Sequence, residues 1–137
     1  SAELDKIVPD HSGLAILEFG CGTGLVGLRY TERAASLDMV DASPAMLDVL
    51  RVKEEARESH VTVHEGTLSM LLGKTIAPES ADWIISSMAL HHVEDIPSLI
   101  GEMQQMIKQQ LMTSGTNFLI FLFIYFYSYL FVFFIYI

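Results

Sequence analysis

Apolar residues gather in short runs along the first 108 residues of the chain. These runs lie at residues 14–19, 37–40, 61–64 and 82–86, and each has the length of a strand buried in a sheet. The segments between them have apolar positions at helical spacing, which predict helices over 25–36, 44–57 and 95–108, with a turn and a short helix at 66–72. The pattern therefore predicts strands that alternate with helices.

This alternation indicates an α/β fold with a doubly wound, mainly parallel sheet, because parallel strands need crossover connections. Residues 14–108 are long enough for one such domain, and the polar residues 1–13, with breakers at Pro9 and Gly13, are interpreted as a lead-in. Ligands of these sheets bind outside the carboxyl ends of the strands. The residues that directly follow each strand are therefore the candidates for a binding site.

The charge and cysteine content exclude some classes of function. The chain of 137 residues carries a formal net charge of −9 at pH 7, which disfavours binding to a nucleic-acid backbone. Its single cysteine, Cys21, cannot form a disulfide within the chain, and no Cys/His cluster has zinc spacing. We expect no nucleic-acid partner and no metal, and a cytoplasmic location is compatible with this cysteine usage.

Three glycines follow the first apolar run at every second position. Gly20, Gly22 and Gly24 allow a sharp turn and a close approach of the backbone to a ligand. A dinucleotide-binding turn would have its third glycine at position 25, where this chain has Leu25. The run predicts a nucleotide-type cofactor site that is not of the dinucleotide type; the alternative is a tight turn that binds nothing.

Two carboxylates are further candidates: one directly precedes the glycines and the other lies 17 residues after Gly24. Asp41 ends the second run, where a carboxylate can accept hydrogen bonds from both hydroxyls of a ribose. Glu18 is a charge in an otherwise apolar strand, which requires a partner such as the ammonium group of a cofactor. The alternatives are an ordinary aspartate at the entry to a loop and a carboxylate at a strand edge.

Four features, in this order, resemble the class I S-adenosylmethionine-dependent methyltransferases of the small-molecule type. They are the acid and glycine run at 18–24, Asp41, the segment 43–47 (Ser-Pro-Ala-Met-Leu), and the segment 90–93 (Leu-His-His-Val). The resemblance covers about residues 14–108 and implies a Rossmann-like methyltransferase fold with S-adenosyl-L-methionine as cofactor. The chain departs from the family pattern at Thr67, which follows Gly66 where the family often has an acid near the adenine.

The resemblance also implies site residues and a reaction. The cofactor would contact Glu18, Gly20, Cys21, Gly22, Thr23, Gly24, Asp41, Ala42, Met46, Gly66, Thr67 and Ser87, and His91 and His92 are candidates for a general base. Methyl transfer from a sulfonium is an in-line displacement that needs positioning rather than a covalent intermediate. Cys21 is interpreted as a small turn residue rather than a nucleophile, because no Lys or Arg is next to it in sequence. We expect transfer to a small-molecule acceptor; the alternative is a non-catalytic or defective cofactor-binding fragment.

The chain changes character after Lys108, its last charged residue. Residues 109–117 are interpreted as a linker, and the family's usual Lys-Pro-Gly-Gly and further strands do not follow, so we expect a domain that is incomplete after the fourth strand and its helix. Residues 118–137 are uncharged and rich in aromatic residues. Three interpretations stay open: a membrane-spanning helix that anchors the protein, a fifth strand over about 118–124, and a translated non-coding stretch.

Overall fold

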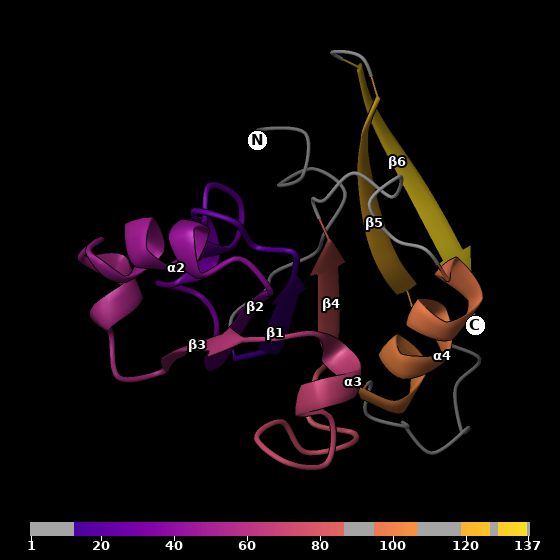
Figure 1. Cartoon of the computed structure of the whole chain (residues 1–137), viewed down its shortest axis with the longest axis horizontal. Coiled ribbons are helices and arrows are strands. Elements are labelled where there is room, and N and C mark those ends of the chain that lie inside the picture. Colours follow the sequence, from indigo (N-terminus) through magenta and orange to yellow (C-terminus); the bar gives the residue numbers. More distant parts are fainter. Residues whose placement is uncertain (1–12, 87–94, 107–118, 127–128, 137) are drawn as a thin grey trace.

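The computed structural model describes residues 13–86, 95–106, 119–126 and 129–136. A single six-stranded sheet runs through it in the order β3-β2-β1-β4-β5-β6 (Figure 1). Its strands are β1 (Ala15–Phe19), β2 (Ser36–Asp41), β3 (Val61–Glu65), β4 (Trp83–Ser86), β5 (Leu119–Phe126) and β6 (Tyr129–Tyr136). All neighbours pair in parallel except β5 and β6, which are antiparallel. The predicted doubly wound parallel sheet is confirmed, and its strand order reverses between β1 and β4.

Helical segments connect these strands, and local capping residues start the longer ones. They are the 3₁₀ turns η1 (Gly27–Tyr30) and η2 (Glu55–Arg57) and the α-helices α2 (Pro44–Arg51), α3 (Leu68–Leu71) and α4 (Ile96–Met106). At the start of α2, Ser43 Oγ accepts a hydrogen bond of 3.5 Å from the Met46 N–H. At the start of α4, Asp95 Oδ1 accepts one of 3.0 Å from the Ser98 N–H. Both predicted starts, at Ser43-Pro44 and at Asp95, are confirmed.

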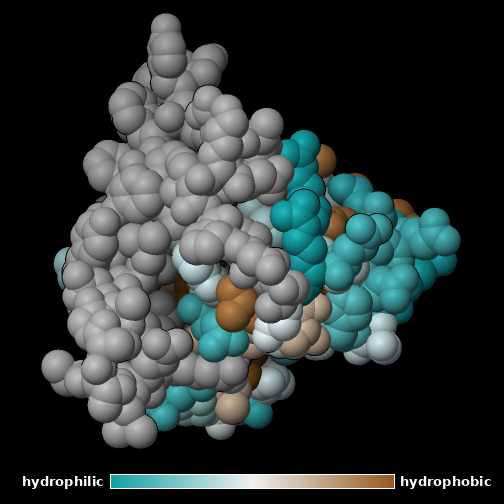
Figure 2. Space-filling view, turned by 180° about the vertical axis from the view of Figure 1, so that it is seen from behind, coloured by the Kyte–Doolittle hydropathy of each residue, from teal (hydrophilic) through white to brown (hydrophobic). Residues whose placement is uncertain are grey.

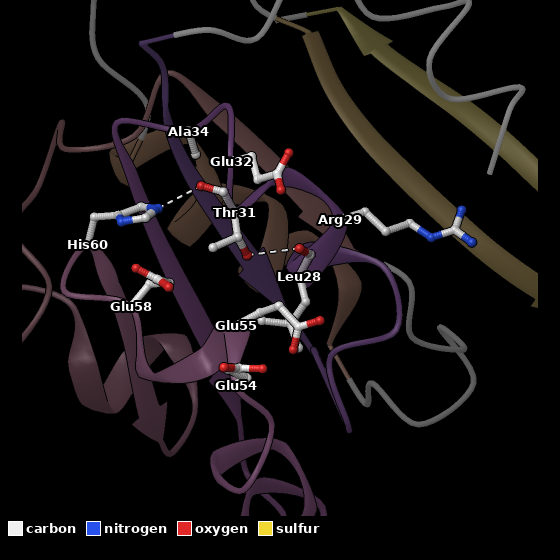
Figure 3. Close-up of a pocket in the computed structure, with 9 residues that line it drawn as sticks. All are labelled: Leu28, Arg29, Thr31, Glu32, Ala34, Glu54, Glu55, Glu58 and His60. Carbon is white, nitrogen blue, oxygen red and sulfur yellow. Dashed lines mark hydrogen bonds between the residues drawn. The ribbon is translucent and has the colours of Figure 1, made fainter.

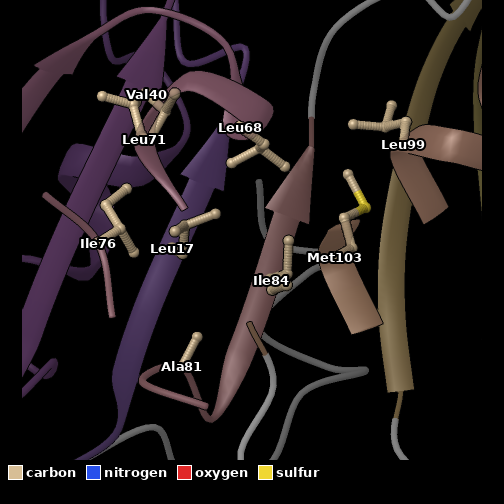
Figure 4. Packing of buried hydrophobic residues seen from close by; sticks show 9 residues of the cluster. All are labelled: Leu17, Val40, Leu68, Leu71, Ile76, Ala81, Ile84, Leu99 and Met103. Atoms are coloured by element: carbon tan, nitrogen blue, oxygen red, sulfur yellow. The ribbon is translucent and has the colours of Figure 1, made fainter. Parts of the chain in front are cut away.

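The sheet has a separate hydrophobic core on each face, because alternate residues of a strand point to opposite sides. One core joins the strands to α3 and α4 and contains Leu17, Val40, Leu68, Leu71, Ile76, Ala81, Ile84, Leu99 and Met103 (Figure 4). The other joins the strands to η1 and α2 and contains Ile16, Cys21, Tyr30, Leu37, Met39, Leu47, Leu50 and Ile85. Seen from behind, the described surface is mostly hydrophilic (Figure 2).

The predicted helix over 25–36 is wrong, since the structure has only the short turn η1 there. Its backbone bonds mix two spacings: the Leu28 N–H donates to Gly24 O at 3.2 Å, while the Arg29 N–H donates to Val26 O at 3.2 Å. A glycine inside a helix costs about 1 kcal/mol relative to alanine, and Gly27 lies near the start of this segment, as the first residue of η1. The helix predicted over 44–57 is likewise shorter: α2 ends at Arg51, and η2 follows it.

The interpretation of residues 118–137 as a membrane-spanning helix is also wrong. Residues 119–126 and 129–136 of this segment form β5 and β6, and the described residues contain no helix long and apolar enough to cross a membrane. β5 pairs in parallel with β4 through Ile85↔Phe121 and Ser86↔Leu122, so the sheet continues past the fourth strand. Aromatic and β-branched residues favour strands, and β5 pairs the edge that β4 would otherwise expose. The fifth-strand interpretation is therefore confirmed, with a sixth strand that it did not include.

The other segment boundaries remain predictions. Most of the lead-in, residues 1–12, and the whole linker, residues 109–117, lie outside the described residues. The expected domain over 14–108 contains β1 to β4 with their helices. The interpretation of residues 118–137 as a translated non-coding stretch also stays a prediction.

Candidate cofactor site

The glycine turn after β1 has a backbone that only glycine adopts easily. Gly20, Gly22 and Gly24 have φ angles of 67°, 55° and 82°, in the left-handed region where a side chain is strained. A Cβ built on Gly22 meets nothing within 4 Å, whereas one on Gly24 would lie 2.5 Å from Leu50 Cδ1. Gly22 therefore faces open space into which a ligand can come close to the backbone, and Gly24 packs the turn against α2.

Asp41 fastens this turn to the end of β2. Its Oδ2 accepts a hydrogen bond of 2.8 Å from the Gly22 N–H, and its Oδ1 accepts one of 2.8 Å from the Ser43 N–H. The backbone carbonyl of Asp41 accepts from the Gly66 N–H at 3.0 Å. An ionised carboxylate has about four acceptor sites, so two backbone bonds leave Asp41 able to accept bonds from ligand hydroxyls. Asp41 thus joins the loops that follow β1, β2 and β3.

Glu18 lies beneath the turn and is completely buried, with 0% of its surface exposed. It is on the sheet face covered by η1 and α2, and a Cβ added to Gly27 would collide with its Oε2. The sequence predicted this carboxylate as a partner for a cofactor ammonium group. The structure buries the Glu18 side chain beneath the turn. Its contact with a cofactor ammonium group therefore stays a prediction.

Cys21 fits the role of a small turn residue. Its Sγ lies 3.7 Å from Gly22 O, and its side chain belongs to the core beside α2. Burial, reinforced by the charges of Glu18 and Asp41, raises the pKa of this thiol far above its usual range. A thiol that stays protonated is a poor nucleophile. The same two carboxylates lie close to the turn.

The other predicted residues fall at the same edge of the sheet where they are described. Ala42 and Met46 are exposed next to Asp41. Gly66 has a φ angle of 143°, and Thr67 uses its hydroxyl to cap α3, accepting a 3.4 Å bond from the Met70 N–H. The hydroxyl oxygen of Thr67 already accepts a hydrogen bond from the backbone of α3. Thr67 is therefore not a direct substitute for the acid that the family often has at this position.

Three predicted site residues lie outside the described residues: Ser87, His91 and His92. They follow β4, whose carboxyl end is next to the glycine turn through the register Phe19↔Ser86. Their predicted roles stay predictions.

Sequence reasoning missed Lys53, just beyond α2. Its Nζ donates a hydrogen bond of 2.6 Å to the backbone carbonyl of Thr23, in the glycine turn. The available signal was a cation shortly after the helix that starts at Ser43-Pro44. Nothing in that pattern shows that the side chain reaches back to the turn.

A hollow of about 590 Å³ lies elsewhere, between η1 and η2 (Figure 3). Its lining includes Ala34 and His60, which come just before β2 and β3, and the His60 ring lies with Nε2 2.6 Å from Thr31 O. The hollow is therefore at the amino ends of these strands, and the glycine turn is at their carboxyl ends. It is not part of the predicted cofactor site.

Metal chemistry has no visible site in the described part of the chain. Within residues 13–86, 95–106, 119–126 and 129–136, no group of three or more His, Cys, Asp or Glu residues is arranged to hold a metal ion. The glycine turn instead offers backbone groups and the carboxylate of Asp41, which is negatively charged when ionised and can accept hydrogen bonds from a ribose.

Residues 16–110 match the family model described as a methyltransferase domain. The chain therefore belongs to the methyltransferase domain family, in the class I S-adenosylmethionine-dependent group that its motifs resemble. This match spans β1 to α4 and includes every element around the glycine turn.

Curated relatives agree with this family. An uncharacterised methyltransferase of Schizosaccharomyces pombe is 28% identical over 104 residues, covering 71% of this chain and 36% of that protein. Malonyl-[acyl-carrier protein] O-methyltransferase of Serratia marcescens is 26% identical over 98 residues, covering 72% and 36%. Ubiquinone biosynthesis O-methyltransferase of Rhodopseudomonas palustris is 28% identical over 98 residues, covering 71% and 37%. The chain thus matches little more than a third of the length of these relatives.

Solved structures agree on the fold. An S-adenosylmethionine-dependent methyltransferase from Mesorhizobium loti is similar with a TM-score of 0.70 and 24% identity, covering 90% of this chain and 51% of that chain. Phosphoethanolamine N-methyltransferase 2 of Haemonchus contortus, in complex with S-adenosyl-L-methionine, has a TM-score of 0.72 and 19% identity, covering 90% and 27%. At this identity the likeness supports the Rossmann-like methyltransferase fold.

Proposed function

We propose that this chain binds S-adenosyl-L-methionine at the glycine turn and transfers its methyl group to a small-molecule acceptor. The observation that carries the proposal is the turn itself: Gly22 faces open space, and Asp41 holds the N–H of Gly22 while keeping further acceptor capacity. Membership of the methyltransferase family supports the choice of cofactor.

The residues present fit this cofactor in charge and shape. The side chain of Asp41 is partly exposed at the end of β2, where it can accept bonds from the ribose hydroxyls. The absence of a side chain at Gly22 lets the cofactor lie against the backbone. The charges of Glu18 and Asp41 favour a ligand that carries a sulfonium and an ammonium group.

When bound, the cofactor supplies an electrophilic methyl group. The chain's own residues must hold that group in line with the acceptor and exclude water. The glycine turn and Asp41 serve the first task by fixing the cofactor at one edge of the sheet. We infer that His91 and His92, which follow β4 in sequence, are the candidates for removing a proton from the acceptor.

Relatives guide the choice of acceptors for an assay. Two of them are named as O-methyltransferases, one of malonyl-[acyl-carrier protein] and one of ubiquinone biosynthesis. We therefore propose an acceptor that presents a carboxylate or hydroxyl oxygen, and an assay panel should contain both kinds.

A second candidate is a cofactor-binding fragment without transfer activity. It is favoured by coverage, since the chain matches 36% of the length of the first two relatives. Acceptor-binding parts of those proteins can lie in the unmatched remainder. The two candidates share the cofactor site and differ only in catalysis.

Titration of the full chain with S-adenosylhomocysteine tests the shared part. We expect saturable binding by calorimetry, a loss of at least about tenfold in affinity for Asp41→Ala, and little change for Asp48→Ala, an exposed carboxylate of α2. Absence of binding by the wild-type chain would reject the cofactor proposal. Transfer of a labelled methyl group to any member of the panel supports the enzyme; binding without transfer supports the fragment.

Location and other partners stay part of the proposal. A cytoplasmic protein without a nucleic-acid partner is supported by the single cysteine and the net charge of −9. Fractionation of cells that express the full chain tests the location, and recovery with membranes would contradict it.

A further inference from the structure

The bond between Lys53 and the glycine turn links two parts of the chain that are far apart in sequence. Lys53 Nζ donates to Thr23 O at 2.6 Å, across a separation of 30 residues. Lys53 is partly buried and follows the last turn of α2. Its aliphatic stem therefore lies along the protein while its ammonium group reaches the turn.

This bond fixes one peptide plane of the turn from both sides. The carbonyl of Thr23 and the N–H of Gly24 belong to the same peptide unit. Lys53 holds the carbonyl, and Cys21 O accepts a 2.9 Å bond from the Gly24 N–H. A rotation of this peptide would break both bonds at once.

Glycine turns need such fixing because glycine has many backbone conformations of similar energy. The preceding part of the turn is held by Val40 O, which accepts from the Cys21 N–H at 3.0 Å, and by Asp41, which accepts from the Gly22 N–H at 2.8 Å. Lys53 holds the remaining part next to Gly24, whose φ angle of 82° is already in the glycine region. Of these fastenings, only the bonds from Asp41 and Lys53 use a side chain.

We propose that Lys53 is a positioning residue of the cofactor site. By holding the Thr23–Gly24 peptide, it keeps the turn in the conformation in which Gly22 faces open space, and so reduces the ordering that cofactor binding would otherwise require. Lys53 acts through the turn and makes no contact with the reacting atoms. This inference rests on the proposed function, because it concerns the same cofactor site.

The test compares four forms of the full chain: wild type, Lys53→Met, Lys53→Arg and Arg51→Met. Methionine keeps an unbranched stem and removes the donor, and arginine restores a cationic donor. Arg51→Met is the matched control, since it removes a positive charge only two residues before Lys53, at the end of α2, where Arg51 lies 3.7 Å from the exposed Asp48. S-adenosylhomocysteine is the probe in calorimetry, and amide hydrogen exchange reports the turn without ligand.

We expect Lys53→Met to bind the probe about tenfold more weakly, which corresponds to about 1.4 kcal/mol at 25 °C. Arg51→Met should bind like the wild type, and Lys53→Arg should recover most of the loss. Without ligand, the Gly24 amide should exchange faster in Lys53→Met, while the amides of β1 keep their wild-type protection. This separates an effect on the turn from general loss of stability.

Two results would overturn the inference alone: wild-type affinity in Lys53→Met, or a loss of affinity accompanied by equally faster exchange in β1. If the wild-type chain does not bind the probe, the proposed function fails first and the inference with it. Should Lys53→Met not fold, Lys53→Leu, which also lacks a donor, replaces it, and the same two measurements decide.

Discussion

At the scale of single residues, the buried carboxyl group of Glu18 determines which residue can occupy position 27. The Glu18 side chain is fully buried, and a Cβ on Gly27 would collide with its Oε2 and come within 2.9 Å of Met39 Cε. Buried side chains of a packed core have little room to move away. A glycine is therefore required at position 27 by the space that Glu18 occupies, although the φ angle of Gly27 is one that any residue can adopt.

We predict that Gly27→Ala lowers the free energy of unfolding by about 1–3 kcal/mol, because overpacking costs about that much. Urea unfolding followed by tryptophan fluorescence measures it, since Trp83 packs against the same core. Gly101→Ala is the control: Gly101 is in α4 with nothing within 4 Å of an added Cβ. There the substitution should be neutral or stabilising by up to about 1 kcal/mol. Equal effects of the two substitutions would contradict the packing explanation.

Cys21 gives a pH-dependent prediction. Burial and the charges of Glu18 and Asp41 raise the pKa of its thiol in the folded chain, while the unfolded thiol keeps an ordinary value of about 8.5. Above that pH the unfolded state loses a proton that the folded state retains, so alkaline pH favours unfolding. Its contribution to stability is complete below about pH 8.5 and is lost progressively as pH rises beyond it.

The measurement is the difference in unfolding free energy between the wild type and Cys21→Ala from pH 7 to pH 10. We expect a constant difference up to about pH 8 and then a fall in the stability of the wild type relative to the variant. Using the difference removes the titration of lysines and tyrosines that both chains share. A difference that stays flat to pH 10 would show that the thiol ionises normally.

Residues of the candidate site could be predicted from sequence where their role follows from the local chain, such as a turn or the end of a strand. Gly20, Gly22 and Gly24 were predicted from their spacing, and their positive φ angles agree with it. Asp41 was predicted from its place after the second strand, and it does lie beside the turn. Lys53 could not be predicted, because its contact with Thr23 exists only once α2 packs back on β1.

At the scale of elements, helix starts were predictable and helix lengths were not. Ser43 and Asp95 were predicted as starts and act as caps, because capping involves residues only three positions apart. The segment over 25–36 has apolar residues at helical spacing, yet it forms only η1. Gly27 in this turn packs against the buried Glu18, and periodicity carries no information about such contacts.

The cap of α4 should weaken in acid. The Ser98 hydroxyl, which donates to Asp95 Oδ2 at 2.7 Å, and the Ser98 N–H hold the pKa of Asp95 below its usual value. A carboxyl whose pKa is lower in the folded state stabilises it above its unfolded pKa of about 3.9, and this is lost as pH falls through the folded value. We therefore expect Asp95→Ala to destabilise the chain at pH 7 and to have a smaller effect at pH 3.

Urea unfolding of both chains at the two pH values measures this change. Asp48→Ala is the control, because it removes an exposed carboxylate from within α2 rather than from a helix cap. An effect of Asp95→Ala that is the same at pH 3 and pH 7 would mean that the charged form is not needed for the cap.

At the scale of the whole molecule, the sheet is completed by a segment whose composition alone was ambiguous. Twenty uncharged residues can cross a bilayer as a helix or pair as strands, and the choice depends on what they can pair with. Here the edge of β4 that faces away from β1 is available for pairing, and β5 pairs with it in parallel register. Local sequence cannot show that edge, because β4 becomes available only when the first four strands have assembled.

Backbone labelling gives a direct prediction for this segment. Of the 8 phenylalanines in the chain, all except Phe19 lie within residues 118–134. Carbonyl ¹³C-phenylalanine therefore reports mainly on β5 and β6, and the pair Phe121↔Phe134 is directly opposed between them. We expect a strand-type labelled amide band in the infrared spectrum, strengthened by coupling between opposed residues, because β5 and β6 pair along their whole length.

Carbonyl ¹³C-methionine is the control, since four of the seven methionines, Met46, Met70, Met103 and Met106, lie in helices, while Met39 lies in β2. Its band should therefore have more helical character than the phenylalanine band. A helix-type band from the phenylalanine label would contradict the two strands and return the segment to the anchor interpretation. The same label distinguishes folded strands from aggregation: β5 and β6 should lose their strand band together with the tryptophan signal in urea, whereas aggregated strands resist denaturant. A strand band that outlasts the unfolding of the domain would mean that the segment pairs with other copies rather than with β4.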